Sequence, residues 1–100
     1  EEIFTLERKA IVPIAYTLHQ NYPNPFNAIT SIRFSVGAMH ASSLNIFDIN
    51  GRLVSTLVNA ILEPGYHTVQ WDATRFSSGV YIIRLEAGSF SQSQKIILLK

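Results

Sequence analysis

The chain contains no cysteine, few charged residues and no long apolar run. The absence of cysteine excludes disulfides, thiolate nucleophiles and cysteine-based zinc sites. Eight basic and seven acidic residues leave a formal net charge of +1, which gives no electrostatic reason to expect binding to nucleic acid or to an anionic membrane. No apolar run exceeds four residues, far below the ~20 that a membrane-spanning helix needs, so we expect no transmembrane segment.

Groups that carry out catalysis or hold cofactors do not occur in clusters. The histidines stand on three separate segments, at His19, His40 and His67, without the spacing of metal ligands. The five glycines occur singly, so there is no glycine-rich phosphate loop. We therefore expect no catalytic residue, no metal and no cofactor, and a protein that is not an enzyme.

What the chain does contain is enough apolar material for one packed domain. Its 100 residues are 47% hydrophobic, and a chain of this length buries a single core. Residues 1–13 carry five of the 15 charged residues and end at Pro13, which predicts a linker or the end of a preceding domain. Residues 14–100 form the predicted domain. Because the sequence starts with Glu1 and shows no signal peptide, we expect a piece of a longer protein.

Apolar and polar residues alternate with a period of two along most of this domain, which indicates strands with one buried face. Clusters of Gly, Pro, Asn, Asp and Ser separate the strands. Seven short strands without a convincing amphipathic helix predict an antiparallel sandwich or barrel. Two facing sheets are favoured, since neither sheet could cover its apolar face alone. The predicted strands are 14–19, 31–36, 44–49, 53–58, 66–71, 79–86 and 90–99.

Two short segments predict tight turns between neighbouring strands. Asn50-Gly51 is the strongest two-residue hairpin signal, because both central positions of that turn take a positive φ. It predicts a hairpin between the strands at 44–49 and 53–58. Residues 87–89 (Ala-Gly-Ser) predict a second tight turn before the final strand.

The loop at residues 21–27 reads Asn-Tyr-Pro-Asn-Pro-Phe-Asn. Its prolines remove backbone donors and hold the preceding residues extended, and its asparagines can bond their own backbone. These properties predict a stiff, self-capped loop in which Phe26 fills the edge of the sandwich. Structural roles follow for Asn24, Pro25, Phe26 and Asn27, and an exposed recognition loop stays open as the alternative.

Two aromatic residues are expected to organise the core. Trp71 ends a strand, where tryptophan is usually a core anchor, although an exposed platform for stacking a sugar is the functional alternative. Asp72 is expected to organise the turn that follows. Tyr81 lies two residues after Gly79, and a tyrosine at such a corner often bonds an upstream backbone carbonyl to close a Greek-key crossing.

The last residues are the hardest to explain by fold stability. Lys95 and Lys100 bracket the apolar run 96–99. Such a run suits a strand buried on both faces, or a strand that its lysines protect against edge aggregation. The run also leaves a strand end that carries basic side chains and a carboxylate, which a receptor could recognise.

These landmarks occur in a fixed order, and together they resemble the type A C-terminal sorting domain of the bacterial type IX (Por) secretion system. The resemblance runs from about Leu18 to Lys100. The segments that carry it are Asn21-Tyr22-Pro23-Asn24-Pro25-Phe26-Asn27, the hairpin from Asp48 to Gly51-Arg52, Gly65 with His67, Trp71-Asp72, Ser78-Gly79-Val80-Tyr81 and the lysine-bounded end.

The resemblance implies an immunoglobulin-like sandwich of about seven strands that the type IX machinery recognises. An upstream cargo protein would then pass from the periplasm across the outer membrane to the cell surface or the medium. A sortase-like peptidase would cut in or before residues 1–13. The recognition residues implied in this way are Gly79, Tyr81, Lys95, Ile96, Ile97, Leu98, Leu99 and Lys100.

Two other hypotheses remain open on the sequence alone. The domain is either a carbohydrate-binding accessory module of a secreted hydrolase, with Trp71 at the sugar, or a structural immunoglobulin-like spacer. Of the three hypotheses, only the sorting signal gives the lysine-bounded end a function.

Overall fold

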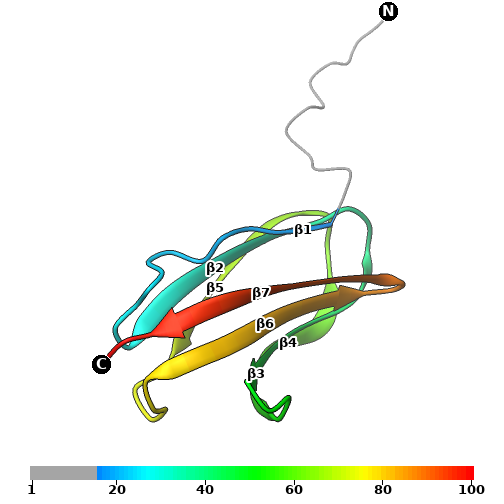
Figure 1. Cartoon of the computed structure of the whole chain (residues 1–100). Coiled ribbons are helices and arrows are strands. Elements are labelled where there is room, and N and C mark those ends of the chain that lie inside the picture. The colour runs from blue at the N-terminus through cyan, green and yellow to red at the C-terminus, as the bar shows by residue number, and fades with distance from the viewer. Residues whose placement is uncertain (1–15) are drawn as a thin grey trace, which may run out of the picture.

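Residues 16–100 are described by the computed structural model of the chain, and they form two antiparallel sheets packed face to face (Figure 1). This part of the chain contains seven strands and no helix. The expected linker at 1–13 and the start of the first predicted strand lie outside the described residues. The strands are β1 (Thr17–Leu18), β2 (Ile29–Val36), β3 (His40–Asp48), β4 (Leu53–Leu62), β5 (Gly65–Asp72), β6 (Gly79–Ala87) and β7 (Phe90–Leu98).

The strand order identifies the topology. One sheet has the order β1-β2-β5 and the other the order β4-β3-β6-β7, so the chain crosses between the sheets after β2, β4 and β5. Strands β1, β2 and β5 lie opposite β3, β6 and β7, and β4 is added at the outer side of β3. This is the Greek-key arrangement of immunoglobulin-like domains. The predicted all-β sandwich is confirmed. The strands β3 and β4 are longer than predicted, since β3 begins at His40 and β4 continues to Leu62.

The core lies between the two sheets, and the period-two pattern determines which residues enter it. On β6 the alternate residues Tyr81, Ile83 and Leu85 are buried, whereas Arg84 and Glu86 face outward, as the pattern predicts. Burying each of these large side chains contributes about 1.5–3 kcal/mol. The other fully enclosed aliphatic side chains come from both sheets: Ile32, Val36, Leu44, Ile46, Ile96 and Leu98.

Trp71 is the centre of an aromatic cluster at one end of the core. Its ring centroid lies 5.3 Å from that of Tyr81, 5.4 Å from that of Phe76 and 5.8 Å from that of Phe26. Only 2% of the Trp71 surface is exposed, so the ring presents no face on which a sugar could stack. The core role holds, and the sugar-stacking alternative for this residue is wrong.

Tyr81 closes the crossing from β5 to β6. Its hydroxyl donates a 2.7 Å hydrogen bond to the backbone carbonyl of Ser77, four residues upstream. This is the tyrosine-corner contact that the position of Tyr81 after Gly79 predicts.

The hairpin between β3 and β4 forms, but its turn differs from the prediction. Only Gly51 has a positive φ, of 86°, so the turn is not the type in which both central residues do. The backbone N–H of Gly51 donates to the carbonyl of Asp48, and the N–H of Asp48 donates to the carbonyl of Arg52. This is a three-residue loop that ends in a glycine bulge. The carboxylate of Asp48 selects it, since Oδ1 accepts the N–H groups of Asn50 and Arg52, both at 2.9 Å.

The second expected turn is a two-residue hairpin loop. Ala87 pairs with Phe90, which leaves Gly88 and Ser89 as the two central residues. A positive φ at Gly88 alone, of 60°, is the pattern of a type II′ turn. This turn joins β6 to β7 and sets the register of the final strand.

Candidate functional site

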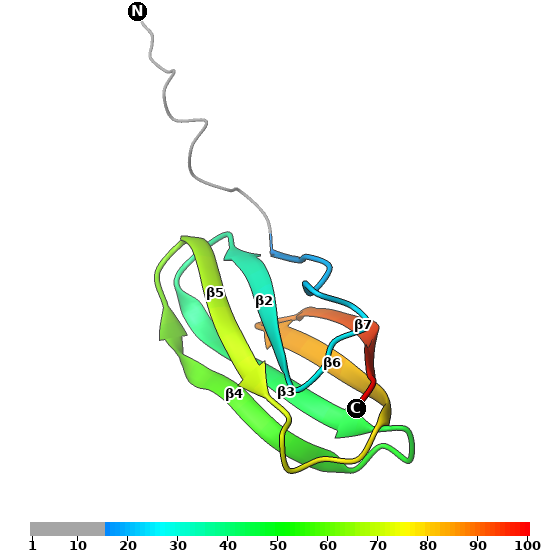
Figure 2. The ribbon, with the colours of Figure 1, turned by 90° about the vertical axis from the view of Figure 1, so that its left-hand side faces the viewer.

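The strand β7 lies at the end of its sheet, yet the loop at 21–27 covers the edge that faces away from β6 (Figure 2). The N–H of Phe26 donates to the carbonyl of Ile97 at 2.9 Å, and the N–H of Leu99 donates to the carbonyl of Phe26 at 2.8 Å. The side-chain oxygen of Asn24 accepts the N–H of Ile97 at 3.0 Å. The loop therefore supplies the partners that a neighbouring strand would supply, and Phe26 fills the edge as expected.

Nearer its start, β7 bonds the backbone at 18–19 through side-chain amides. Gln92 both accepts the N–H of Leu18 at 3.1 Å and donates to the carbonyl of Leu18 at 3.2 Å. Gln94 donates to the carbonyl of His19 at 2.7 Å. These contacts satisfy backbone groups of β1 and of the residue after it, which the outer strand of the other sheet would otherwise expose to other chains.

Lys100 anchors the residues beyond β7 to the loop between β5 and β6. Its ammonium group donates to the backbone carbonyls of Thr74 and Phe76, the latter at 2.7 Å. Its backbone N–H donates to the hydroxyl of Ser78 at 2.9 Å. One of the two bracketing lysines therefore has a clear structural contact.

The apolar run at the end of β7 alternates between the two faces of its sheet. Ile96 and Leu98 are completely buried, whereas Ile97 is half-buried and Leu99 is 56% exposed. The expectation of a strand buried on both faces is wrong, because the second sheet covers only one of them. The other face presents Ile97 and Leu99 outward, next to Lys95.

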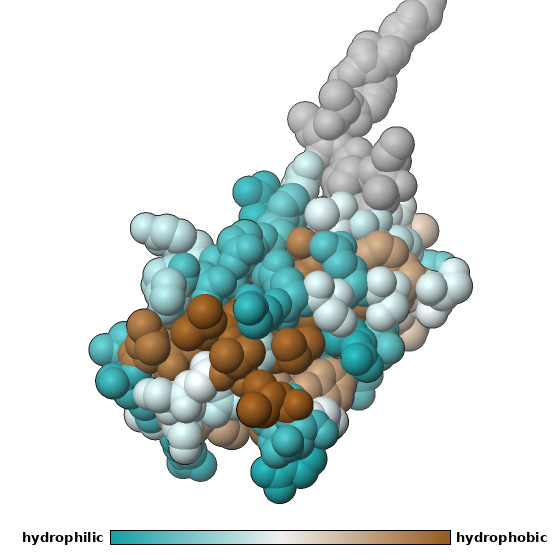
Figure 3. All heavy atoms as spheres, in the orientation of Figure 1, coloured by the Kyte–Doolittle hydropathy of each residue, from teal (hydrophilic) through white to brown (hydrophobic). Residues whose placement is uncertain are grey.

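Neighbouring strands extend these outward residues into a continuous apolar surface (Figure 3). In the register of the sheet Val80 pairs with Ile97, and Ile82 lies between Lys95 and Phe47. Exposed contiguous apolar surface of this kind marks interaction sites in soluble domains. We call it the outer apolar patch, and it consists of Phe47, Ile49, Leu53, Val80, Ile82, Ile97 and Leu99.

The structure divides the residues expected to take part in recognition into two groups. Gly79, Lys95, Ile97, Leu99 and Lys100 reach the surface, wholly or in part. Tyr81, Ile96 and Leu98 are buried, so a receptor could not touch their side chains without opening the core. Sequence reasoning did not select the patch residues on β3, β4 and β6. The available signal was the unbroken apolar run 80–83, in which both faces of β6 are apolar.

The charges beside the patch are mainly positive. Arg84 lies over the ring of Phe47, with its guanidinium carbon 4.9 Å from the ring centroid. The acid nearest to it along the β3–β4 hairpin, Asp48, is held by a 3.1 Å ion pair with Arg52. Hydrogen bonds from the Arg52 backbone, then from the Asn50 backbone and the Arg52 side chain, keep the pKa of Asp48 below its ordinary value of 3.8.

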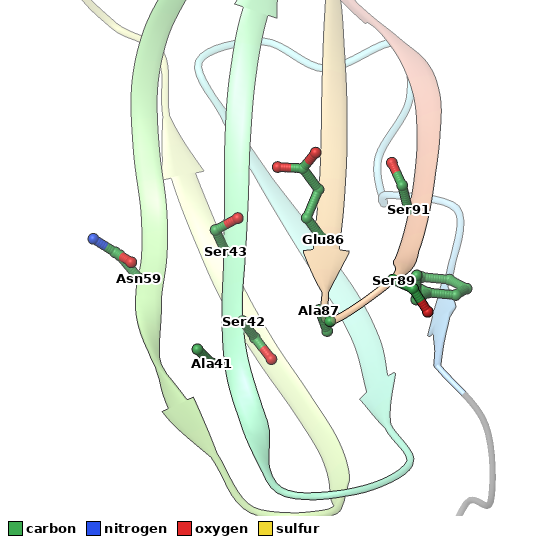
Figure 4. Close-up of a pocket in the computed structure, with 10 residues that line it drawn as sticks. Ala41, Ser42, Ser43, Asn59, Glu86, Ala87, Ser89 and Ser91 are labelled. Atoms are coloured by element: carbon green, nitrogen blue, oxygen red, sulfur yellow. The ribbon is translucent and has the colours of Figure 1, made fainter.

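A second surface feature lies at the opposite end of the same face. A shallow hollow of about 480 Å³ opens there because the surrounding side chains are short (Figure 4). Glu86 is the one carboxylate among hydroxyl and amide groups such as Ser43, Asn59 and Ser91. In residues 16–100 no three His, Cys, Asp or Glu side chains gather to hold a metal ion. The same residues include no helix long and apolar enough to span a membrane.

The family of the chain follows from comparison with known proteins. A family model described as a secretion system C-terminal sorting domain matches residues 20–99. The chain belongs to this family. The sorting domain is therefore a signal for type IX secretion, which implies export to the cell surface or the medium. Its family is one of sorting signals and is not an enzyme family.

A solved structure with a similar fold is PorZ of Porphyromonas gingivalis, described as an essential bacterial surface component of the type-IX secretion system. It matches the sorting domain with a TM-score of 0.59 and 22% sequence identity. The match covers 85% of this chain and 11% of PorZ, so the likeness concerns the fold of one part of that protein. No curated protein matched the chain.

Proposed function

We propose that the type IX machinery reads the outer apolar patch of the folded domain, and that this contact carries an upstream cargo protein to the cell surface or the medium. The observation behind the proposal is the alternation at the end of β7, where Ile97 and Leu99 face outward while Ile96 and Leu98 fill the core. A receptor that binds apolar residues needs them at fixed positions. The bonds from Asn24 and Phe26 provide that fixed position.

The signal on this proposal is a surface of the folded domain rather than a linear peptide. Its residues come from β3, β4, β6 and β7, from the hairpin loop between β3 and β4 and from the residue after β7, and only the folded sheet brings them together. A sortase-like peptidase at the outer membrane would cut in or before residues 1–13, which separate the cargo from the sorting domain. Lys95 stands beside the patch and adds a positive charge to the surface that the machinery would contact.

The test is export of a periplasmic reporter protein fused upstream of residues 14–100 in a type IX host. We expect the wild-type fusion on the cell surface or in the medium. The double variant Ile97→Ser/Leu99→Ser should stay in the periplasm, because it replaces two outward apolar side chains and leaves the core intact. Ile61→Ser is the matched control, since Ile61 on β4 is 68% exposed and lies outside the patch.

Each result separates the hypotheses. Periplasmic retention of the wild-type fusion would contradict the sorting function and favour a structural spacer. Export of the double variant at the wild-type level would contradict the assignment of the patch alone. Loss of export in both variants would indicate a general effect of surface serine and would also contradict the patch.

A further inference from the structure

The outer apolar patch contains a small socket between the β3–β4 hairpin and β6. It has a volume of about 180 Å³, room for one large side chain. Its lining consists of Phe47, Asp48, Ile49, Gly51, Ile82 and Arg84. Sockets that accept one bulky apolar anchor are the usual centres of binding energy in protein interfaces.

Two cations that have no acidic partner among residues 16–100 stand at this socket. The guanidinium of Arg84 stacks on Phe47, its Nε donates to the hydroxyl of Ser93 at 3.3 Å, and it has no ion pair with any of residues 16–100. Lys95 sits beside Ile82 in the sheet register, and it has no ion pair with any of residues 16–100. The lining acid Asp48 already pairs with Arg52. The local charge available to a ligand is therefore positive.

We propose that the socket binds one bulky apolar side chain of an acidic polypeptide segment, whose flanking carboxylates contact Arg84 and Lys95. The proposal rests on the function given above for this face, and it specifies the chemistry of the partner. The apolar anchor supplies affinity by leaving water, and the carboxylates select the partner and its orientation.

A polypeptide fits the charge pattern better than a lipid surface. Recognition of anionic lipid headgroups typically uses clusters of 4–8 lysines and arginines. At the socket two cations, neither in an ion pair with the described residues, flank one discrete cavity, which matches a single side chain with a carboxylate on either side. Arginine also favours the bidentate geometry of a carboxylate.

The first experiment titrates the 100-residue chain with synthetic peptides while its backbone amide signals are recorded by NMR. Three short peptides serve as probes: an acidic peptide with one central phenylalanine, the same peptide with serine in its place, and a basic peptide with the central phenylalanine. The acidic phenylalanine peptide should shift the amide signals of Ile82, Arg84 and Lys95. The serine peptide should bind at least about tenfold more weakly, because it buries no aromatic ring. The basic peptide should not shift these signals.

The second experiment repeats the titration with charge-removing variants. Arg84→Gln and Lys95→Gln should each weaken binding about two- to fivefold, as expected for exposed ion pairs. Arg33→Gln is the matched control, since Arg33 also stacks on an aromatic ring, that of Tyr66 at 4.7 Å, but belongs to the other sheet. Unchanged amide spectra away from the substituted residue establish that the variants are folded.

The results decide the inference separately from the proposed function. Equal binding of the acidic and basic peptides, or unchanged affinity in both Gln variants, would overturn the inference. A lipid ligand is tested by sedimentation of the chain with phosphatidylglycerol vesicles. If the wild type sediments with them, both Gln variants do not and no peptide binds, the socket binds lipid and the inference is overturned as well. If the Gln variants export the reporter as fully as the wild type does, the result contradicts the inference but not the sorting function. Retention of the wild-type fusion in the periplasm would contradict the proposed sorting function itself.

Discussion

The two outer strands of the four-stranded sheet protect their edges in different ways. The free edge of β7 has backbone partners in the loop at 21–27, and the Gln92 and Gln94 side chains of β7 bond the backbone at 18–19. β4 carries no charge and no proline over ten residues, and instead it has two bulges against β3, with Leu57 and Val54 unpaired. Bulges twist an edge away from other chains, whereas partners also hold each residue in place. The difference explains why β7 is suited to presenting a recognition surface.

Phe26→Ala should have the largest effect, because it removes a buried ring from the closed edge and from the cluster around Trp71. We expect a loss of about 3–5 kcal/mol in the free energy of unfolding. Its counterpart on the open edge, Ile61→Ala, should change that value by less than about 0.5 kcal/mol. Urea denaturation measures both, and similar losses in the two variants would remove the distinction between the edges.

Asn24→Ala should leave the N–H of Ile97 without its acceptor while the loop remains. We expect a loss of about 1–2 kcal/mol, typical of a partly buried donor that loses its partner. Hydrogen exchange at the Ile97 amide should become faster than in the wild type. Asn59→Ala, an exposed change on β4, is the control and should cost less than about 0.5 kcal/mol. Unaltered exchange at Ile97 would show that the loop does not hold the strand.

Lys100→Met should lower the free energy of unfolding by less than about 1 kcal/mol, because the contacts of Lys100 with Thr74 and Phe76 are exposed to solvent. Lys95→Met should leave stability unchanged, since Lys95 has no ion pair with the described residues. Thermal unfolding of the two variants compares the bracketing lysines directly. A larger loss in the Lys95 variant would reverse their assigned roles, one structural and one free for binding.

The smallest effect concerns the hairpin that leads into β4. The folded-state pKa of Asp48 is lowered, so its stabilising contribution is complete above the ordinary value of 3.8 and is lost as the pH falls through the lowered value. Asp48→Asn removes this titration and keeps an oxygen for the turn. Denaturation at about pH 5 and about pH 2 should therefore show a smaller loss of stability in the variant than in the wild type. An equal loss would assign the acid sensitivity to other groups.

Local patterns in the sequence were sufficient for much of the fold. Period-two alternation located the strands, and the placement of Tyr81 after Gly79 indicated the corner that the hydroxyl closes. The turn at Asn50-Gly51 was predicted with the wrong geometry, because the dipeptide rule omits the Asp48 side chain. That carboxylate binds two backbone N–H groups and favours a longer loop.

The candidate site depends on contacts that local patterns do not contain. Asn24 and Ile97 are 73 residues apart, and neither residue type indicates the other as its partner. The apolar patch likewise needs the register of four strands, which brings Phe47 next to Ile82. The sequence pointed to the end of β7 through its lysines, although the exposed or buried state of each residue there required the second sheet.

The contacts of the loop with β7 have one further consequence. The run Ile96-Ile97-Leu98-Leu99 is nearly degenerate, since a shift by one residue would bury Ile97 and Leu99 in place of Ile96 and Leu98 with almost the same apolar volume. The apolar volume of the run therefore does not select between the two registers, but the same shift would also turn the charged Lys95 side chain toward the core. The bonds that Asn24 and Phe26 make to the backbone at 97 and 99 add to the selection made by Lys95 and by the turn at Gly88-Ser89. The loop therefore helps to determine that Ile97 and Leu99 face outward while Ile96 and Leu98 face the core.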